Sequence, residues 1–333
     1  MSMPETRELT FRDAIREALI EEMAAQPEMV IIGEDITPGG GTFGIHAGMA
    51  ETFGARMFEA PISEASIVGV AVGAAMAGGR AVAEIMYSDF LTVCMDEIVN
   101  QAAKMRYMTG GQAEVPLVVR SPIGMTRGIA AQHSQSLEAW FAHIPGLRVA
   151  MPASPACAKG LLKTALRGRD PVVFLEHKML YGTKGPVPAG DHLLPYGQAR
   201  IVRAGDDITL IATGLTVGWA CDAADRLSER GISAEVIDPR TVSPIDWETI
   251  LDSVRKTSRA VVINEATLTC SVASEIAAGI GESCFAYLDG PVRRVGSPFV
   301  PKPSTPGLEK LAYPSVDEIV NQALSLMPRR QGR

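Results

Sequence analysis

Short apolar runs alternate with amphipathic stretches along most of the chain. The first amphipathic stretch follows Thr10, where apolar residues recur at helical spacing between charged ones: Phe11, Ile15, Ala18 and Leu19. In the first half, apolar runs predict buried strands over 29–32, 56–60, 81–86, 115–120, 147–151 and 171–175. The intervening stretches predict helices after residue 62, over 90–107 and over 155–167. Short strands that alternate with helices predict a parallel sheet covered on both faces.

A segment rich in glycine and proline interrupts this alternation. The stretch from Tyr181 to Pro195, YGTKGPVPAGDHLLP, holds three glycines and three prolines, which is typical of a domain boundary. The alternation then resumes, with strands predicted over 208–212, 234–237 and 260–263 and helices over 217–230, 246–255 and 271–282. We therefore predict an α/β protein of two doubly wound domains, 1–185 and a smaller one at 198–333, joined by a linker at 186–197.

Composition and charge exclude several classes of protein. A chain of 333 residues with 47% hydrophobic and 21% charged residues has a globular composition and is too long for one ordinary core. Its net charge of -7, without a long basic run, argues against a nucleic-acid partner, which would need a positive surface. The longest apolar run falls short of the roughly 20 residues that span a bilayer, so no membrane partner is expected.

Targeting signals and cysteine usage favour a cytoplasmic protein. The N-terminal stretch carries acidic residues and no apolar core, so it does not resemble a secretory signal. The five cysteines are scattered and no pair has CxxC spacing, which argues against a disulfide framework or a zinc knuckle. We expect reduced, buried thiols.

One carboxylate stands at the start of an otherwise apolar helix. In EAPISEASIVGVAVGAAMAGG, residues 59–79, Glu64 precedes a run of mostly small apolar residues. A buried carboxylate is costly unless it finds a partner or takes up a proton. Alternatively, Glu64 is only a helix-start residue that the helix dipole favours. Within the helix, Gly69, Gly73 and Ala77 form a flat stripe, which suits either packing inside one domain or an interface with another subunit.

Two further segments allow a structural or a functional interpretation. The glycine-rich segment from Gly39 to Gly44 is not a dinucleotide fingerprint, and it is either a flexible surface loop or a loop near an active site. His133, in AAQHSQSLEAWFAHIPG, lies among polar side chains and is either solvated or able to exchange a proton near neutral pH. Ser134 has no nucleophile elbow around it, so a hydrolase triad is not indicated.

Several motifs together carry a family resemblance. They occur in the order GEDITPGGGTFG, APISEASIVGVAVGAAMAGGRAVAEIMYSDF, NQAAKMRYMTGGQ, QHSQSLEAWFAHIPGLRVAMPASP and EVIDPRTVSPID. Over residues 7–325 the chain resembles the beta subunit of the decarboxylating component of 2-oxo acid dehydrogenase complexes, which are thiamine diphosphate enzymes related to transketolase. Acetoin dehydrogenase beta subunits are most similar in three segments, DFLTVCMDEIVNQAAKMRYMTGG, FLEHKMLYG and EATLTCSVASEIAA. Pyruvate and branched-chain enzymes are close behind.

The resemblance implies a pyrimidine-binding domain followed by a transketolase C-terminal-like domain, and it assigns roles to residues. Glu64, in PISE, matches the glutamate that contacts N1′ of the aminopyrimidine and promotes removal of the thiazolium C2 proton. Phe90 matches the aromatic that stacks on this ring, and Glu34 matches a second carboxylate near it. His133 matches a histidine that assists proton transfer or receives the lipoyl arm. A structural potassium ion is implied at backbone carbonyls, by position those of Leu117, Ala165, Leu166, Gly168 and Asp170.

A missing motif implies partners. Family members that hold the diphosphate carry GDG followed by an asparagine that binds Mg²⁺, and the nearest strings here, at 190–192 and 205–207, do not fit. The resemblance therefore implies an alpha subunit that holds Mg²⁺, with thiamine diphosphate at the interface of an α₂β₂ assembly. It also implies a lipoyl acyltransferase core, which the C-terminal domain helps to dock, and a small keto or hydroxyketo substrate whose acyl unit passes to the lipoyl groups.

The substrate itself stays open among acetoin, pyruvate and branched-chain 2-oxo acids. Ala60 stands where the family often has threonine before PISE, and the loop 39–48, with His46, departs from the usual framework. Specificity pockets depend on a few side chains, partly those of the other subunit. Two rivals remain: a split transketolase-type ketol transferase, and a non-catalytic scaffold of the same fold. A scaffold would need none of Glu64, Phe90 and His133.

Overall fold

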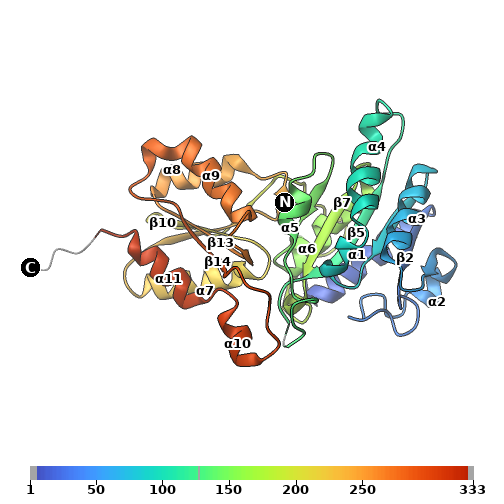
Figure 1. Ribbon diagram of the computed structural model, residues 1–333, viewed down its shortest axis with the longest axis horizontal. Coiled ribbons are helices and arrows are strands. Elements are labelled where there is room, and N and C mark those ends of the chain that lie inside the picture. Colours follow the sequence, from blue (N-terminus) through green and yellow to red (C-terminus); the bar gives the residue numbers. More distant parts are fainter. Residues whose placement is uncertain (1–5, 127, 329–333) are drawn as a thin grey trace, which may run out of the picture. The chain divides into compact units, whose positions relative to one another are not determined.

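The computed structural model describes residues 6–126 and 128–328, which form two compact units (Figure 1). Among these residues, unit 1 contains 6–126, 132–196 and 241–244. Unit 2 contains 128–131, 197–240 and 245–328. Residues 128–131 therefore belong to unit 2, although the chain on both sides of them belongs to unit 1. Residues 241–244 belong to unit 1, although the chain on both sides of them belongs to unit 2.

Unit 1 is built on a seven-stranded sheet in the order β12-β6-β7-β5-β4-β2-β3. All neighbouring strands in it are parallel except β12 and β6, so the prediction of a parallel sheet is confirmed apart from this edge. Every residue of the central strand β5 is buried, as expected of a strand covered on both faces. The strands are β2 Met29–Gly33, β3 Met57–Glu59, β4 Arg80–Glu84, β5 Leu117–Ile123, β6 Arg148–Ala150, β7 Val172–His177 and β12 Thr241–Ser243.

The helices of unit 1 begin where the sequence supplies capping residues. The Thr10 side chain accepts a hydrogen bond from the Asp13 N–H at the start of α1, and Ser154 caps α6 in the same way before a proline at the first helical position. Helices α1 and α6 pack against each other. The helices are α1 Phe11–Ala25, α2 Ala50–Phe53, α3 Glu64–Met76, α4 Ala103–Met108, α5 Glu138–Ala142 and α6 Pro155–Arg167.

The predicted helix over 90–107 is not continuous, and this prediction is wrong in detail. A 3₁₀ turn at Ser88–Thr92 is followed by a π-helical turn at Glu97–Ala102 and then by α4. The π-helical turn still buries Ile98 and Ala102. An apolar pattern cannot distinguish these hydrogen-bonding schemes, because the same positions stay buried in both.

A two-stranded antiparallel sheet was not expected from the sequence. It joins β1 Thr6–Thr10 to β8 Lys184–Pro188, and Thr6 lies opposite Pro188. Strand β8 lies inside the glycine- and proline-rich stretch that indicated a domain boundary. Its prolines are tolerated because this sheet has only edge strands.

Unit 2 is built on a five-stranded sheet in the order β14-β13-β10-β11-β9, which is parallel except for β9. Its strands are β9 Arg200–Arg203, β10 Ile208–Ala212, β11 Ala234–Asp238, β13 Ala260–Thr267 and β14 Arg293–Ser297. Its helices are α7 Thr216–Ser228, α8 Trp247–Thr257, α9 Val272–Cys284, α10 Pro306–Leu311 and α11 Val316–Ser325. The predicted fold class, α/β with two domains of this kind, is confirmed.

The cysteines and the helices bear on two further expectations. All five cysteines are free thiols, and Cys94, Cys157 and Cys284 are buried as expected. Cys221 is only partly buried and Cys270 is exposed, so the expectation of buried thiols is wrong for these two. Cys270 lies in the loop between β13 and α9. In the part of the chain that the structure describes, no helix combines the length and the apolar character needed to cross a membrane.

Candidate active site

Acidic residues gather where the parallel strands of unit 1 end. The register pairs Gly33 of β2 with Glu84 of β4, and Glu84 with Arg120 of β5. Glu34 therefore follows β2 at the edge of the sheet where Glu84 ends β4. In open parallel sheets, ligands bind at this carboxyl edge.

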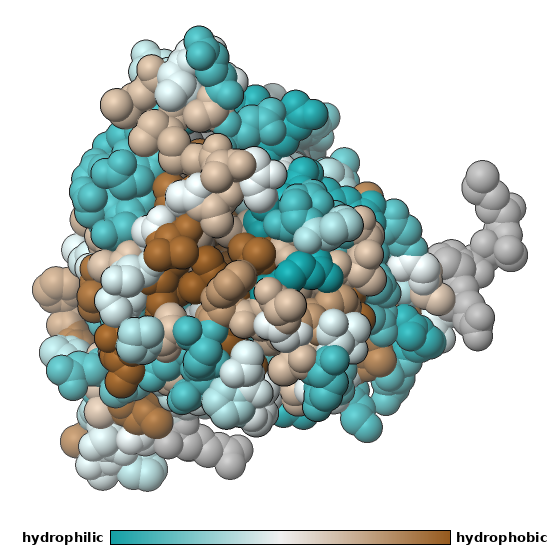
Figure 2. All heavy atoms as spheres, turned by 90° about the vertical axis from the view of Figure 1, so that its right-hand side faces the viewer, coloured by the Kyte–Doolittle hydropathy of each residue, from teal (hydrophilic) through white to brown (hydrophobic). Residues whose placement is uncertain are grey.

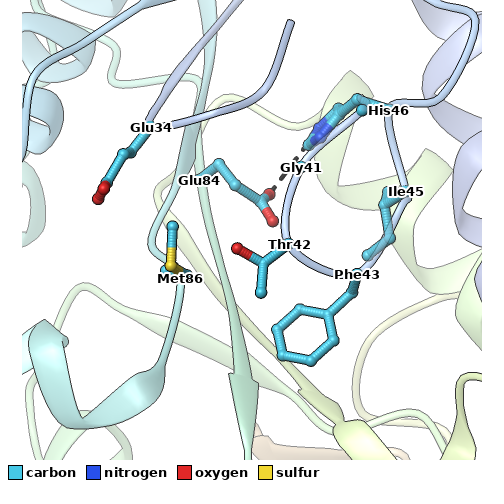
Figure 3. A pocket seen from close by; sticks show the side chains of 9 residues that line it. Glu34, Gly41, Thr42, Phe43, Ile45, His46, Glu84 and Met86 are labelled. Carbon is cyan, nitrogen blue, oxygen red and sulfur yellow. Dashed lines mark ion pairs between the residues drawn. The ribbon is translucent and has the colours of Figure 1, made fainter. Parts of the chain in front are cut away.

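A small cavity lies at this edge, between the strand ends and the loop 40–46 (Figure 3). The loop lies on one side of the carboxylate of Glu84, and the side chain of Glu34 lies on the other side of this carboxylate. At about 10 Å³ the cavity has room for one water molecule at most, so it cannot itself hold a cofactor ring. Its lining consists of Glu34, Gly40, Gly41, Thr42, Phe43, Ile45, His46, Glu84 and Met86.

The glycine-rich loop is held in a defined position. Arg16 of α1 donates hydrogen bonds from Nε to the carbonyl of Ile45 at 2.9 Å and from Nη2 to the carbonyl of Gly44. Gly40 has a φ of +82°, and a Cβ there would lie 2.3 Å from the backbone nitrogen of Ala47, so this position requires glycine. Since the loop lines the cavity beside two carboxylates, the structure favours a loop near an active site over a flexible surface loop.

Glu64 is the first residue of α3 and is half-buried. The positive end of a helix dipole is a favourable place for a carboxylate side chain. The pKa of Glu34 is raised, mainly by partial burial. The nearby carboxylates of Asp35, Glu64 and Glu59 raise it further. Burial raises the pKa of the Cys94 thiol to about 12, and the charge of Glu64 adds to this effect. Glu64 therefore lies within electrostatic reach of both Glu34 and the segment that carries Phe90.

Three rings meet beside this segment. The ring centroids of Phe90 and His133 lie 5.5 Å apart, and each ring contacts Tyr87 edge-on, at 5.7 Å and 4.8 Å respectively. Aromatic pairs are favourable in this edge-to-face arrangement. The structure therefore brings together two residues, Phe90 and His133, that the sequence singled out separately.

The loop of His133 is fixed by side chains that sequence reasoning missed. Lys178 donates a hydrogen bond to the backbone carbonyl of His133, and its Nζ lies 5.2 Å from the ring centroid of Tyr87. Ser88 donates a hydrogen bond to the carbonyl of Gln135 at 3.0 Å. Tyr87 and Lys178 both stand in motifs that carried the family resemblance, YSDF and FLEHKMLYG, which is the signal that could have pointed to them.

A buried ionic cluster lies behind the cavity. Arg120, which is 1% exposed, donates from Nη1 to Glu84 at 2.6 Å and from Nε and Nη2 to the two oxygens of Glu176, both at 2.7 Å. Tyr181 donates a further hydrogen bond to Glu176 at 2.9 Å. One guanidinium therefore faces two carboxylates, so a single cation neutralises only one of them.

His46 cannot supply the missing positive charge. Its Nε2 lies 4.0 Å from Glu84, as the dashed line in Figure 3 marks, but burial and then the charges of Arg120 and Arg16 lower its pKa to about 3. Burial raises the pKa of Glu84 to about 7, against the opposing charge of Arg120. The extra proton of the cluster therefore belongs on Glu84.

We expect Glu84→Gln to change how stability depends on pH. Because the folded-state pKa of Glu84 is raised, its contribution to stability is complete below the ordinary pKa of a glutamate and is lost as the pH rises through about 7. Glutamine does not ionise, so the variant should gain about 2 kcal/mol relative to the unchanged chain between pH 5 and pH 8. Urea unfolding of both proteins at the two pH values measures this. A difference that does not depend on pH would contradict the assignment.

The residues predicted to bind potassium lie together at the opposite, amino edge of the sheet. Leu117 begins β5, and the others end α6 or precede β7: Ala165, Leu166, Gly168 and Asp170. An arginine occupies part of this position, because Nη1 of Arg80 donates to the carbonyls of Leu166 and Gly168. Two of these carbonyls, those of Leu166 and Gly168, thus already bind a cationic side chain, and the potassium site stays a prediction. Over residues 6–126 and 128–328, no group of His, Cys, Asp or Glu side chains is arranged to hold a metal ion.

Comparisons with known proteins find similarity along most of the chain. A family model for the transketolase pyrimidine binding domain matches residues 7–184, and one for the transketolase C-terminal domain matches residues 197–319. The chain is 44% identical over 331 residues to the beta subunit of acetoin:2,6-dichlorophenolindophenol oxidoreductase of Cupriavidus necator, covering 96% of this chain and 98% of the relative. The chain belongs to this family of transketolase-like beta subunits.

This beta subunit has relatives in several dehydrogenases. It is 45% identical to a mitochondrial pyruvate dehydrogenase E1 component subunit beta-2 of Oryza sativa, covering 95% of this chain and 86% of the relative. It is 44% identical to the 2-oxoisovalerate dehydrogenase subunit beta of Bacillus subtilis, covering 93% and 96%. A solved split gene transketolase, an inactive beta4 tetramer, shares the fold with a TM-score of 0.81 at 24% identity, covering 96% and 98%.

The family depends on thiamine diphosphate, and the residues of this beta subunit fit the aminopyrimidine half of that cofactor. The ring nitrogens need hydrogen-bonding partners, which Glu64 and Glu34 can offer, and the ring face suits an aromatic side chain such as Phe90. A diphosphate needs cations. Two buried cations of this region, Arg120 and Lys178, are bonded to carboxylates and to a backbone carbonyl.

Proposed function

We propose that this beta subunit supplies the aminopyrimidine half of a thiamine diphosphate site, whose diphosphate and Mg²⁺ an alpha subunit holds in an α₂β₂ assembly. One observation carries the proposal: a half-buried carboxylate, Glu64, opens an apolar helix within electrostatic reach of Glu34 and of the segment bearing Phe90. A carboxylate in surroundings of low polarity forms a strong hydrogen bond to a ring nitrogen.

Each residue has a role in this proposal. Glu64 holds a proton at N1′ of the aminopyrimidine, and Glu34 adds a second carboxylate to the hydrogen-bonding network of that ring. Phe90 stacks on the ring. His133, whose ring contacts that of Phe90, moves a proton at the reacting carbon or at the incoming lipoyl arm. When bound, thiamine diphosphate supplies the nucleophile and the electron sink.

The reaction that fits is cleavage of a small keto or hydroxyketo substrate, with transfer of the acyl unit to lipoyl groups of an acyltransferase core. Relatives named for acetoin, pyruvate and 2-oxoisovalerate support this class, but they are 43–45% identical and do not select one substrate. Assays of the reconstituted complex with acetoin, pyruvate and 3-methyl-2-oxobutanoate, using an artificial electron acceptor, identify it. Transfer to an aldose without lipoyl would instead indicate a split transketolase.

The uncovered face of α3 supports a partner subunit. A Cβ added at Gly69 would lie 3.6 Å from the Cγ atom of Glu97. A Cβ added at Gly73 would meet no atom of the neighbouring elements within 4 Å. On the same helix Val70 is 60% exposed and Met76 is 40% exposed. Figure 2 shows apolar residues gathered on the face of the molecule turned toward the viewer, which is the right-hand side of Figure 1, where α3 is labelled. Exposed apolar surface of this kind marks an interaction site.

The proposed division of the cofactor site between two subunits predicts which sample binds thiamine diphosphate. Thiamine diphosphate with Mg²⁺ should bind to the purified alpha–beta complex and should show no measurable binding to this chain alone at concentrations that saturate the complex. The reason is that the alpha subunit contributes the contacts to the diphosphate. Isothermal titration calorimetry on the two samples measures this. Tight binding by the lone chain in the presence of Mg²⁺ would refute the split.

A further inference from the structure

The end of α6 presents carbonyl oxygens that no residue of the same helix can satisfy. The last carbonyls of a helix lack intrahelical partners and carry the negative end of its dipole. Here the Gly168 N–H donates to the carbonyl of Ala165 at 3.0 Å, which closes the helix. The carbonyls of Leu166 and Gly168 are satisfied from outside, by a residue more than eighty positions earlier in the chain.

Arg80 is that residue, and it is the first residue of β4. A single atom, its Nη1, donates to Leu166 O at 3.1 Å and to Gly168 O at 2.7 Å. A nitrogen bonded to both oxygens lies where a metal ion would have to lie to coordinate both. Glu28 approaches Nε of the same guanidinium at 3.4 Å and so fixes its other side. A guanidinium is always protonated in proteins, so this position always holds a positive charge.

The neighbouring charges oppose a second cation. The side chain of Asp170 is the acidic group of this set, and it is engaged by Arg106 and, at 3.0 Å, by Nη2 of Arg148. Two further guanidinium groups thus contact the side chain of Asp170, one of the residues that the family resemblance assigned to potassium, in addition to Arg80 at the carbonyls of Leu166 and Gly168. A potassium ion on the remaining lone pairs would meet like charge at close range, which is unfavourable.

We propose that the guanidinium of Arg80 takes the place of a structural potassium ion in this chain. It links the start of β4 to the end of α6, so that folding of unit 1 needs no monovalent metal. The inference concerns the amino edge of the sheet and does not depend on the proposed reaction at the carboxyl edge.

The test is thermal unfolding of the full-length chain in potassium chloride and in sodium chloride at equal ionic strength. The unchanged chain should show the same Tm in both salts. Arg80→Ala uncovers the carbonyls, so its Tm in sodium chloride should fall by about 3 °C or more. Potassium should restore part of that loss by binding the folded state, by about 2 °C at millimolar or higher concentration.

Arg56 offers a matched control, because it also caps the end of a helix. Its Nη2 donates to Met23 O at 2.8 Å and its Nη1 to Gln26 O at 2.9 Å, at the end of α1. Arg56→Ala should lower Tm equally in the two salts. Arg80→Lys, which keeps the positive charge, replaces the alanine variant if that variant does not fold, and it should remain insensitive to potassium.

Two results would overturn the proposal. A higher Tm of the unchanged chain in potassium chloride than in sodium chloride would show that the ion binds beside Arg80. An Arg80→Ala variant that is equally unstable in both salts would show that these carbonyls do not form a cation site. Neither result bears on thiamine diphosphate binding by the complex, so failure of this inference is distinct from failure of the proposed function.

Discussion

Replacing Glu64 by glutamine is expected to lower the turnover of the assembled alpha–beta enzyme by at least about 100-fold, the range of a lost general acid–base step. Glutamine has the same size but cannot hold or move a proton at the ring nitrogen. The fold should remain, because Glu64 is only half-buried and its interaction with the helix dipole is worth no more than about 2 kcal/mol. Steady-state turnover at saturating thiamine diphosphate, with circular dichroism as a check on folding, measures the effect.

Glu97 supplies the control for this experiment. It lies next to α3, near Gly69, and like Glu64 it contributes to the raised pKa of Cys94, but it has no role in the proposed site. Glu97→Gln removes the same charge from the same side of the molecule and should leave turnover within about twofold of the unchanged enzyme, as expected of a residue outside the reaction. Turnover of Glu64→Gln close to that of the unchanged enzyme would remove Glu64 from the mechanism.

The second large effect is on stability. Arg120→Met is expected to destabilise the folded chain by about 3–5 kcal/mol, because it leaves the buried carboxylate of Glu176 without its counter-ion and removes the hydrogen bond to Glu84. Adding Glu84→Gln and Glu176→Gln to this variant should recover more than half of the loss, since no uncompensated buried charge would remain. The midpoint of urea unfolding at pH 7 measures both effects.

A surface ion pair gives the comparison for Arg120. Arg255 pairs with Asp252 at 2.8 Å on α8, and both side chains are exposed. Arg255→Met should cost no more than about 0.5 kcal/mol, because exposed pairs are screened by solvent. If Arg120→Met and Arg255→Met shift the unfolding midpoint by the same amount, the buried cluster does not stabilise the fold as described.

The alternation of strands and helices was predictable because it depends on local periodicity, and so was the helix that begins at Glu64. The pairing of β1 with β8 was not, because β8 contains two prolines and its partner lies at the other end of unit 1. The π-helical turn at Glu97–Ala102 leaves the apolar pattern unchanged and therefore gives no signal in the sequence.

The candidate site was predictable only in part. Glu34, Glu64, Phe90 and His133 stand in recognisable motifs, and their roles remain proposals. The buried cluster has no local signature, because Arg120 lies 36 and 56 positions from its two carboxylate partners and only strand register brings them together. Arg80 was missed for a different reason: its acceptors are backbone carbonyls, which every residue type carries.

The most direct test of the central claim is a structure of the assembled alpha–beta complex with thiamine diphosphate and Mg²⁺, in which the distance from the Glu64 carboxylate to N1′ of the aminopyrimidine is measured. We predict a hydrogen-bonding distance of about 2.6–3.2 Å, with the diphosphate held by the alpha subunit. An aminopyrimidine ring beyond hydrogen-bonding reach of Glu64, or a cofactor held wholly by one chain, would contradict the account.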